Sequence, residues 1–362
     1  MSQTMFPCAQ CGANLEFVPG SDAQQCPYCG HVNPIAAASA SVRELDFDAF
    51  LREAMGREEV QESITVKCTS CGAESTKPPN VTSGECPFCG ANIVATGSSR
   101  KSLKPKALLP FHVPPEHARK AFRDWIHSLW FAPNALRKLA RQDSRLNGMY
   151  TPYWTYDCFV TTEYTGQRGD DYWDTETYHT TVNGRRETRT RQVRRTRWRH
   201  ASGVVQNTFD DVLVMASHSL PRKYAQALEP WDLQNLVPYQ DEYLSGFRAE
   251  SYQVDLPEGF VKAKELMDPA IRSTICRDIG GDHQRIHSMD SQYDNVTFKH
   301  ILLPVWISAY RYRDQVYRFL VNARTGEVQG ERPWSWVKIL LAILAATPII
   351  VAIVYAIMQA EQ

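Results

Sequence analysis

Eight of the ten cysteines in this 362-residue chain form two four-cysteine motifs with the same spacing. Each motif consists of two Cys-x2-Cys pairs separated by fourteen residues. Two thiolates three positions apart on a tight turn can occupy two corners of a tetrahedron, and a second turn supplies the other two. The spacing therefore predicts one metal ion per motif. The ligands are Cys8, Cys11, Cys26 and Cys29 in the first motif and Cys68, Cys71, Cys86 and Cys89 in the second.

A glycine follows the second cysteine of every pair, at Gly12, Gly30, Gly72 and Gly90. Glycine adopts the positive φ that such turns require. Four thiolates leave no open position on a Zn²⁺ ion, so the motifs predict two structural Zn²⁺ sites without a catalytic role. Redox-active cysteine pairs are the alternative, but a single pair in a βαβ unit would be expected for that chemistry.

The cysteine pairs also indicate the compartment. The first ten residues, MSQTMFPCAQ, lack the apolar run of a signal peptide. Paired spacing suits metal-binding thiolates in a reducing compartment better than it suits the disulfides of a secreted protein. Both short segments hold few apolar side chains, so metal binding is expected to supply their folding free energy.

Charge separates the two classes of macromolecule that a zinc ribbon could bind. The formal net charge of the chain is zero, residues 1–34 contain two acidic residues and no lysine or arginine, and residues 63–95 contain two charges of each sign. Nucleic-acid affinity rests mainly on lysine and arginine contacts to phosphate, so we expect both ribbons to bind protein instead. Their aromatic side chains suit a protein groove; these are Phe6, Phe17, Tyr28 and Phe88.

Composition divides the rest of the chain. Zinc ribbons are expected over residues 1–34 and 63–95, joined by a linker over 35–62. Within that linker, ELDFDAFLREAMG predicts a short amphipathic helix packed beside a ribbon, with a docking helix for a partner as the alternative. A basic, flexible linker is predicted over 96–107. An α+β body follows over 108–332.

Periodicity predicts the elements of the body. PPEHARKAFRDWIHSLWF indicates an amphipathic helix with Pro115 in its first turn, and a second helix is expected over about 133–142. A third fits 258–279, with Pro269 as the residue that would break it. Strand patterns begin at Met149. The expected fold class is therefore two small zinc-ribbon modules, a strand-dominated α+β domain and one C-terminal transmembrane helix.

The strongest hairpin signal is Asn183–Gly184. A two-residue turn at this position pairs residues whose numbers sum to 367. Further strands are expected at 203–206 and 211–216, and two or three more across 284–328.

The second strand of the hairpin contains RRETRTRQVRRTRWR (185–199), with eight arginines and one acidic residue. This run raises the alternative of a membrane-tethered nucleic-acid-binding protein. In the 367 register, however, carboxylates and aromatic rings lie opposite arginines, so we expect contacts within the hairpin. The predicted pairs are Arg191–Glu176, Arg197–Asp170, Arg189–Tyr178 and Arg194–Trp173. A shift of one residue would undo all of them.

An apolar run follows the body. Residues 339–358 carry no charge over twenty positions, about the length that spans a hydrocarbon core of ~30 Å. We expect a transmembrane helix over 336–358, with two tryptophans at its interface. Arg332 and Lys338 lie on its N-terminal flank and no basic residue follows it. The positive-inside rule then predicts a single-pass, tail-anchored protein of the cytoplasmic (inner) membrane with its N-terminus in the cytoplasm.

No catalytic motif is found: the sequence has no P-loop, no His-Glu-x-x-His and no nucleophile elbow. Asp282, His283 and His287 could form a metal corner, but three ligands without a fourth favour a polar loop that leads into a strand. Cys158 and Cys276 are expected to be core thiols. We predict no catalytic or cofactor-binding residue, and a membrane-surface enzyme with an unrecognised site is the second alternative.

The chain resembles a family of bacterial membrane-anchored double-zinc-ribbon proteins. Members are often labelled by their ribbons alone, as primosomal-helicase-like or transcription-factor-IIB-like. The resemblance rests on both four-cysteine motifs, the terminal span and several segments between them. These are LLPF (108–111), YTPYWTYD (150–157), EPWDL (229–233), YLSGFRAESY (243–252), LLPVWISAYRY (302–312) and VNARTGEVQGERP (321–333). Ala323 departs from the family pattern, which has glycine in this hairpin.

The resemblance implies gene neighbours that encode phage-shock-type and SPFH-domain membrane proteins, and a role in envelope stress. It implies no active site, and the helicase label is unsupported because no ATP-binding motif is present. The predicted function is that of a cytoplasm-facing adapter or scaffold. It would use its zinc ribbons for protein–protein contacts at the membrane, with SPFH-type or phage-shock-type proteins as the implied partners.

Overall fold

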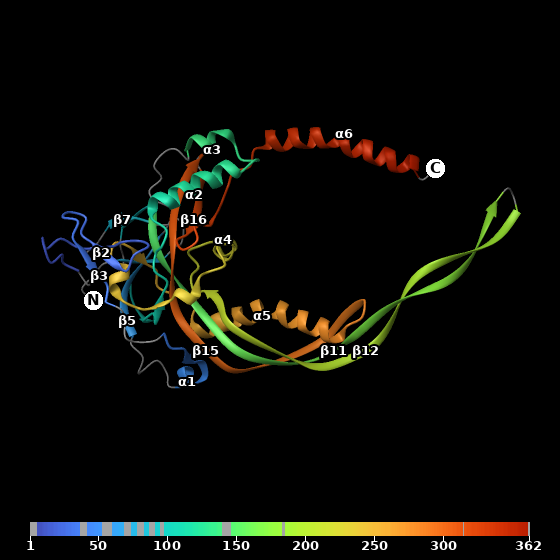
Figure 1. The fold of residues 1–362 in the computed structure, drawn as a ribbon, viewed down its shortest axis with the longest axis horizontal. Helices are drawn as coiled ribbons and strands as arrows, with labels where there is room; N and C mark the ends of the chain where they lie inside the picture. The colour runs from blue at the N-terminus through green and yellow to red at the C-terminus, as the bar shows by residue number, and fades with distance from the viewer. Residues whose placement is uncertain are drawn as a thin grey trace.

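The computed structural model describes residues 6–36, 42–52, 60–68, 74–77, 83–86, 91–94, 98–139, 146–182, 185–313 and 315–360. Within them, nine strands form one curled sheet in the order β12-β11-β15-β10-β13, with the other four attached to β11, β15 and β16 (Figure 1). The strands are β4 (Leu45–Asp46), β10 (Ala107–Leu108), β11 (Asn147–Val182), β12 (Arg185–Met215), β13 (Val237–Pro238), β14 (Arg248–Ala249), β15 (His283–Tyr312), β16 (Gln315–Asn322) and β17 (Val328–Gly330). The body is therefore strand-dominated, as the sequence predicts.

Three long strands give the body its shape. β11 pairs antiparallel with β12 on one side and with β15 on the other. From Val182↔Arg185 to Cys158↔Phe209 the paired numbers of β11 and β12 sum to 367, which confirms the predicted register. The turn residues 183–184 themselves lie outside the described residues.

The separate strands predicted at 203–206 and 211–216 are parts of the continuous strand β12, so that division is wrong. The polar residues between these two apolar segments stay in the strand because their backbone pairs with β11. The third long strand, β15, together with β16 and β17, accounts for the strands predicted across 284–328.

A buried charge cluster lies where the β11–β12 register shifts by one residue, between Tyr156 and Cys158. Lys299 Nζ is 2.7 Å from Asp211 Oδ1 and 3.0 Å from Glu44 Oε1, and the Lys299 side chain is 8% exposed. Burial raises the pKa of Asp157, which lies beside this group, to about 6. The cluster joins Glu44, which directly precedes β4, to the centre of the sheet.

The helix α5 (Leu256–Ile279) lies in the hollow of the curled sheet (Figure 1). Its buried positions recur every three to four residues, as the periodicity predicts. They include Phe260, Ala263, Met267, Ile271 and Ile275. Pro269 does not break the helix, because it lies on the exposed face, where the carbonyl that loses its hydrogen bond can be hydrated.

Gly259 lets the start of α5 approach the sheet closely. A Cβ at this position would lie 2.3 Å from Tyr156 Oη and 2.9 Å from Trp154 Cδ1. Tyr156 Oη donates a hydrogen bond to the Leu256 carbonyl at 2.7 Å. Trp154 Nε1 donates to the Val254 carbonyl at 2.9 Å. Buried hydrogen bonds therefore join the sheet to the beginning of the helix.

The helix α2 (Pro115–Ser128) covers β16 and β17, and the helix α3 (Asn134–Leu139) packs against α2. The helix expected from Pro115 is confirmed as α2, and α3 is the described part of the second. The Phe122 ring of α2 stacks on Phe319 of β16 with centroids 3.6 Å apart. Three short helices follow β12 and precede β14 in the sequence: α4 (Arg222–Gln226), η1 (Leu233–Asn235) and η2 (Asp241–Leu244).

The short helix predicted in the 35–62 linker is α1 (Phe47–Arg52). It packs on the body, which corrects the expectation that it lies beside a ribbon. The Phe47 ring is 4.9 Å from Phe260, and the Phe50 ring is 5.2 Å from Phe298. β4, which precedes α1, pairs with β15.

The cysteine-containing segments form small separate sheets. The first contains β1 (Glu16–Phe17), β2 (Ala23–Gln25) and β3 (Val32–Pro34). The second contains β5 (Val60–Lys67), β6 (Glu74–Lys77) and β9 (Ser98–Leu103), and β7 (Ser83–Glu85) pairs with β8 (Asn92–Val94).

Within residues 96–107, which the sequence predicts as a flexible linker, the described residues 98–107 contain strand β9 and the first residue of β10. β9 pairs with β5 from Ser98 to Leu103, and Leu103 is buried. Ala107 already belongs to β10 in the sheet of the body. Backbone hydrogen bonds hold this serine- and lysine-rich strand in place. Its sequence lacks the alternation of apolar residues that would predict a strand.

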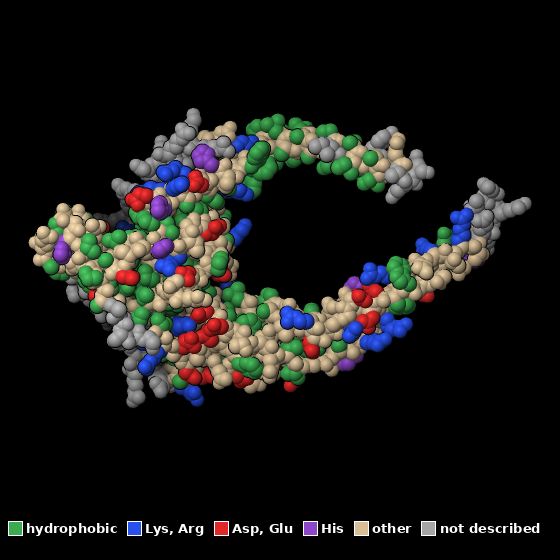
Figure 2. All heavy atoms as spheres, in the orientation of Figure 1, with side chains coloured by type: hydrophobic (Ala, Val, Ile, Leu, Met, Phe, Trp, Pro, Cys, Tyr) green, Lys and Arg blue, Asp and Glu red, His purple; other side chains and the backbone are tan. Residues whose placement is uncertain are grey.

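The helix α6 (Trp336–Ala360) extends away from the body and presents apolar side chains on its surface (Figures 1 and 2). An 18-residue window within its segment Trp336–Gln359 has a mean hydropathy of 2.7. Among the described residues it is the one helix long and apolar enough to cross a membrane. The apolar helix predicted over 336–358 is thus present.

We expect Gly259→Ala to destabilise the protein by about 1–3 kcal/mol, because the added methyl group overlaps Tyr156 Oη. Helix propensity alone would make the same change stabilising by about 0.5–1 kcal/mol. Chemical unfolding of the full chain in detergent, followed by circular dichroism, measures the difference. In the Tyr156→Phe background the cost should fall, because the nearest atom is gone. An equal cost in both backgrounds would contradict this contact.

Candidate metal centre

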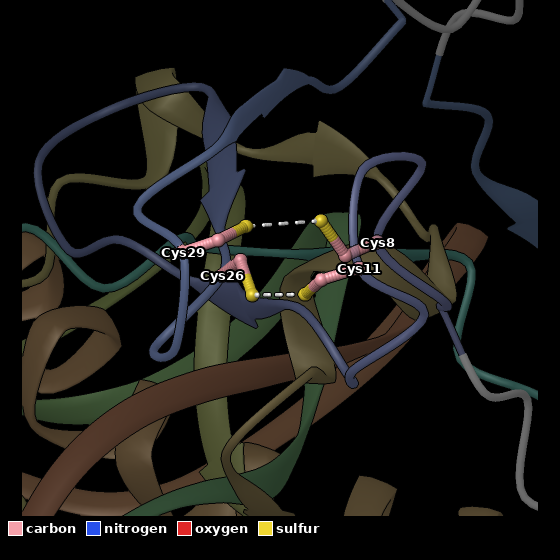
Figure 3. Close-up of side chains that lie close together, drawn as sticks. All are labelled: Cys8, Cys11, Cys26 and Cys29. Atoms are coloured by element: carbon pink, nitrogen blue, oxygen red, sulfur yellow. Dashed lines mark hydrogen bonds between the residues drawn. The ribbon is translucent and has the colours of Figure 1, made fainter.

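The four cysteines of the first motif converge on one point (Figure 3). Cys8 and Cys11 come from the segment before β1, and Cys26 and Cys29 come from the turn between β2 and β3. The Cys8 and Cys29 sulfurs are 3.5 Å apart, and so are the Cys11 and Cys26 sulfurs. All four Sγ atoms lie within 4.8 Å of one another.

These distances fit a tetrahedral metal ion. A Zn–S bond of about 2.3 Å implies sulfurs about 3.8 Å apart at the corners of a tetrahedron. Four soft thiolates and no oxygen ligand are the donor set typical of structural zinc. With all four corners occupied by the protein, the ion would fix the two turns and have no position for a substrate.

The two turns are built alike. The Cys8 N–H donates to the Ala13 carbonyl at 2.7 Å, and the Cys26 N–H donates to the His31 carbonyl at 2.9 Å. Gly12 and Gly30 both have a φ of +74°. The positive φ is the reason that glycine follows each pair, as the sequence predicts.

The protein environment does not treat the four thiols equally. Backbone N–H groups of Cys29 and Tyr28 direct hydrogen bonds at the Cys26 sulfur and lower its pKa to about 6. The His31 N–H acts in the same direction on Cys29, but desolvation and the neighbouring thiols outweigh it and raise that pKa to about 12. Backbone N–H groups at these turns thus favour the thiolate form, and a bound cation would supply the remaining charge that lets the four thiols ionise together.

The first motif is docked firmly on the body. Phe17 is 3% exposed, and its ring lies 5.2 Å from Tyr243. Its backbone N–H donates to the Ser245 carbonyl at 3.0 Å, and Gln24 Nε2 donates to the Glu242 carbonyl at 3.1 Å. Phe17 is thus part of an intramolecular contact, which corrects the expectation that it faces a partner.

Tyr28 has the opposite environment. It lies between Cys26 and Cys29, and 83% of its side chain is exposed. Val32 in β3 is also exposed, at 53%. Among the described aromatic residues predicted as anchors, Tyr28 is the one that stands clear of the body, because Phe6 is half-buried.

Half of the second motif lies within the described residues. Cys68 and Cys86 are buried among body residues that include Ala107 and Leu109. The Cys86 N–H donates to the Ala91 carbonyl at 2.7 Å, the same backbone hydrogen bond that Cys8 and Cys26 make with the fifth residue after them. The predicted ligands Cys71 and Cys89, the glycines Gly72 and Gly90, and Phe88 lie outside the described residues.

Only some arginines of the arginine-rich strand contact the partners that the hairpin register predicts. Arg191 Nη2 is 2.8 Å from Glu176 Oε2, as expected. Arg194 Nη2 bonds Asp171 Oδ2 at 2.5 Å, so Trp173 stays 66% exposed.

Other arginines contact the next residue on the same face of β11, two residues away from the directly opposite one. Arg197 lies over the Tyr172 ring at 4.9 Å, while Asp170 pairs with Arg168 at 2.8 Å. Arg195 Nε is 3.1 Å from Asp174 Oδ2. Arg191, Arg194, Arg195 and Arg197 thus have partners within the hairpin, although diagonal neighbours replace the directly opposite partners of Arg194 and Arg197. The ring of Tyr178, predicted to face Arg189, lies under Arg191 at 5.5 Å.

Asp282 and His283 lead from the end of α5 into β15, which agrees with the predicted polar loop. His283 Nε2 is 3.0 Å from Asp171 Oδ2, and the Asp171 N–H donates to Asp282 Oδ2 at 2.8 Å. His287 lies farther along β15, exposed. Among the described residues these side chains do not form a metal-binding group with each other.

The two remaining cysteines lie in the body. Cys158 is 4% exposed, its sulfur is 3.7 Å from Met267 Sδ, and burial raises its pKa to about 11. Cys276 on α5 is half-buried. Cys158 is thus the core thiol that the sequence predicts.

A contact that the sequence does not reveal fixes the start of α6. Lys338 Nζ donates to the Trp130 and Ala132 carbonyls at 3.1 and 2.8 Å. The Ser335 N–H donates to the Phe131 carbonyl at 2.8 Å. Arg332 stacks over Trp334 at 4.4 Å. The first turn of α6 is therefore tied to the connection between α2 and α3.

An open hollow of about 640 Å³ lies beside β12. Its lining includes two carboxylates, Asp211 and Glu229, and the indole of Trp231, with no histidine or cysteine.

Comparison with known proteins gives one distant relative. The chain is 29% identical over 262 residues to the uncharacterized protein YdjG of Bacillus subtilis (strain 168), a match that covers 69% of this chain and 70% of that protein. No protein-family profile matches the chain. No solved structure matches it either.

We expect Cys26→Ser to remove one equivalent of bound metal and to expose the backbone of β1, β2 and β3, because three thiolates cannot close the site. Elemental analysis measures the metal, and hydrogen–deuterium exchange measures the exposure. Cys276→Ser is the matched control, because it removes a thiol outside both motifs. Unchanged metal content in the Cys26→Ser variant would show that these four residues do not hold an ion.

Proposed function

We propose that this chain is an adapter held at a membrane by α6, with zinc-ribbon modules that present a fixed surface to a protein partner. Tyr28 carries the proposal, because it is 83% exposed on a turn that Cys26 and Cys29 fix at both ends. A rigid aromatic side chain loses little conformational entropy on entering a pocket, so such residues frequently anchor protein interfaces.

The chemistry of the module supports a binding role. A closed four-thiolate site has no position for substrate. Residues 1–34 have no lysine or arginine, so the module lacks the cations that phosphate binding needs. Arg191, Arg194 and Arg195 are paired with carboxylates and Arg197 lies over the Tyr172 ring, which favours the adapter over the nucleic-acid-binding alternative.

The proposed metal content is two structural Zn²⁺ ions, one for each four-cysteine motif. The thiolate set of the first motif and its spacing support zinc. The Cys86 turn, which repeats the backbone hydrogen bond of the first motif, supports a second site.

The proposed location is the cytoplasmic membrane, with the body and both modules on the cytoplasmic side. Arg332 and Lys338 flank α6 on the side of the body, where the positive-inside rule places cytoplasmic residues. The family resemblance suggests an SPFH-type or phage-shock-type membrane protein as partner and envelope stress as the setting. Because the first module is docked on the body, a bound partner would be held in a defined position relative to the membrane.

We expect Tyr28→Ser to reduce partner recovery by about tenfold or more, the effect of losing an anchor worth ~1.4 kcal/mol or more. The measurement is affinity capture of the tagged full chain from detergent-solubilised native membranes, with quantitative mass spectrometry of a candidate SPFH-type protein. Val204→Ser is the control, because it also places a serine at an exposed apolar side chain, outside both cysteine motifs. Metal content should be equal in both variants. Equal recovery from both variants at equal metal content would refute the docking role of this module.

A second expectation concerns the orientation of α6. A reporter that is active only outside the cytoplasm should be active when fused after Gln362 and inactive when fused before Met1. Deleting residues 333–362 should release the protein from the membrane fraction. Activity of the N-terminal fusion would reverse the proposed orientation, and membrane retention after the deletion would show that another element binds lipid.

A further inference from the structure

The hairpin of β11 and β12 extends beyond the rest of the sheet. β15 pairs with β11 only as far as Gly169↔His283. Past this point, residues 170–182 and 185–197 form a two-stranded ribbon, here called the arm (Figure 1). In the described part of the chain, no third strand pairs with either of its outer edges.

A ribbon of this kind is unusual on its own. Thirteen residue pairs at about 3.3 Å per residue make an arm roughly 40 Å long. A two-stranded hairpin without a packed face is marginally stable in water. Each outer edge also presents unpaired backbone N–H and C=O groups, which are a template for another strand.

The charges of the arm are divided between its two strands. Residues 170–182 contain four acidic residues and no lysine or arginine, and residues 185–197 contain seven arginines and one glutamate. Charged side chains of both signs are visible along this part of the molecule in Figure 2. One outer edge of the arm is therefore acidic and the other is basic.

The paired arginines still have room for a second partner. In the Arg191–Glu176 pair the two side chains are 62% and 39% exposed, and in the Arg195–Asp174 pair they are 50% and 45% exposed. A carboxylate from another strand could therefore approach these arginines from the open side of β12 without displacing the first.

We propose that the arm is a self-association surface, in which the basic edge of β12 in one copy pairs with the acidic edge of β11 in the next. The new pairing is antiparallel, so it continues the sheet. Opposite charges facing each other across strands are stabilising, and like charges are destabilising. Pairing of two basic edges or of two acidic edges is thus disfavoured. Pairing of a basic edge with an acidic edge is favoured.

Charges on edge strands also serve to prevent aggregation, and this is the competing explanation. Protection against every neighbour would need the same sign on both edges. The arm has opposite signs, which repel like edges and attract unlike ones. The pattern therefore specifies an orientation as well as an exclusion.

The geometry of such a contact is head-to-tail. A heterologous contact of this kind produces a ring when its rotation closes and a filament when it does not. Each copy keeps the same orientation of the hairpin, with β11 and β12 alternating through the assembly. Every α6 then leaves the assembly on the same side, which is compatible with a single membrane.

Cross-linking distinguishes the two possible edges. Thr177 lies in β11 and Thr190 in β12, and both are exposed. Two full-length chains with different tags, one with Thr177→Cys and the other with Thr190→Cys, are mixed in detergent and treated with a bis-maleimide about 10 Å long, which tolerates a register shift of two residues. The expected product contains one copy of each chain. The chain without an added cysteine reports the background from the native thiols.

Two results of this experiment would overturn the proposal. One is cross-linking of Thr190→Cys with itself as efficient as in the mixture, which would mean that basic edges pair. The other is a mixed product no more abundant than the background, which would mean that the arms do not pair.

Exchanging charges within the arm tests the electrostatic cause. A six-residue variant swaps the signs of three pairs while preserving each pair and the net charge: Asp171→Arg, Asp174→Arg, Glu176→Arg, Arg191→Glu, Arg194→Asp and Arg195→Asp. The acidic edge becomes basic and the other becomes nearly neutral. In this background the mixed cross-link should fall by about tenfold, or ~1.4 kcal/mol. An undiminished yield would show that charge segregation does not direct association.

Discussion

The pairing of β11 with β12 in one register from the hairpin turn to Cys158 is the constraint on which the rest of the structure depends. Successive residues of a strand point to opposite faces, so a shift of one position would turn the apolar residues that face α5 toward solvent. This register places Cys158 and Tyr164 where they contact Met267 and Asp278 of α5. It also brings Glu176 beside Arg191 far out along the hairpin. The core at one end and the charge pairs at the other are thus set by one alignment.

Much of this alignment is local in origin, which is why the sequence predicts it. A two-residue turn at Asn183–Gly184 fixes the sum of paired numbers, and opposite charges on the two strands support it. The first metal site is also local, because the cysteine spacing and the following glycines define the turns. Docking of the first module is not local, because Phe17 contacts Tyr243, which lies more than two hundred residues away in the sequence. The sequence around Phe17 does not distinguish such a buried contact residue from an exposed aromatic residue. β9 is missed for a related reason, since its pairing with β5 uses the backbone and its side chains are polar.

The docked position of the first module changes what the metal site does for the protein. A module that swung on a flexible linker could find a partner in any orientation. Here Phe17 and Gln24 hold the module on the segment 242–245, and β9 joins the second module to the body through β10. The proposed ions would then stiffen two parts of one rigid surface, so affinity for a partner would come from preorganisation. The exposed Tyr28 is a consequence of this arrangement, because the opposite side of the module is already occupied by the body.

The directions of α6 and the arm impose a further physical condition. Both leave the body toward the same side (Figure 1). A charged, two-stranded ribbon with open edges cannot lie in hydrocarbon, where unpaired backbone groups cannot be hydrated. An α6 inserted in a bilayer must therefore diverge from the arm. Ser335 and Lys338 tie the first turn of α6 to the connection between α2 and α3. The base of the arm is also held, because Asp171 contacts Asp282, His283 and Arg194. In the proposed assembly, pairing with a neighbouring copy would satisfy the open edges of the arm outside the membrane.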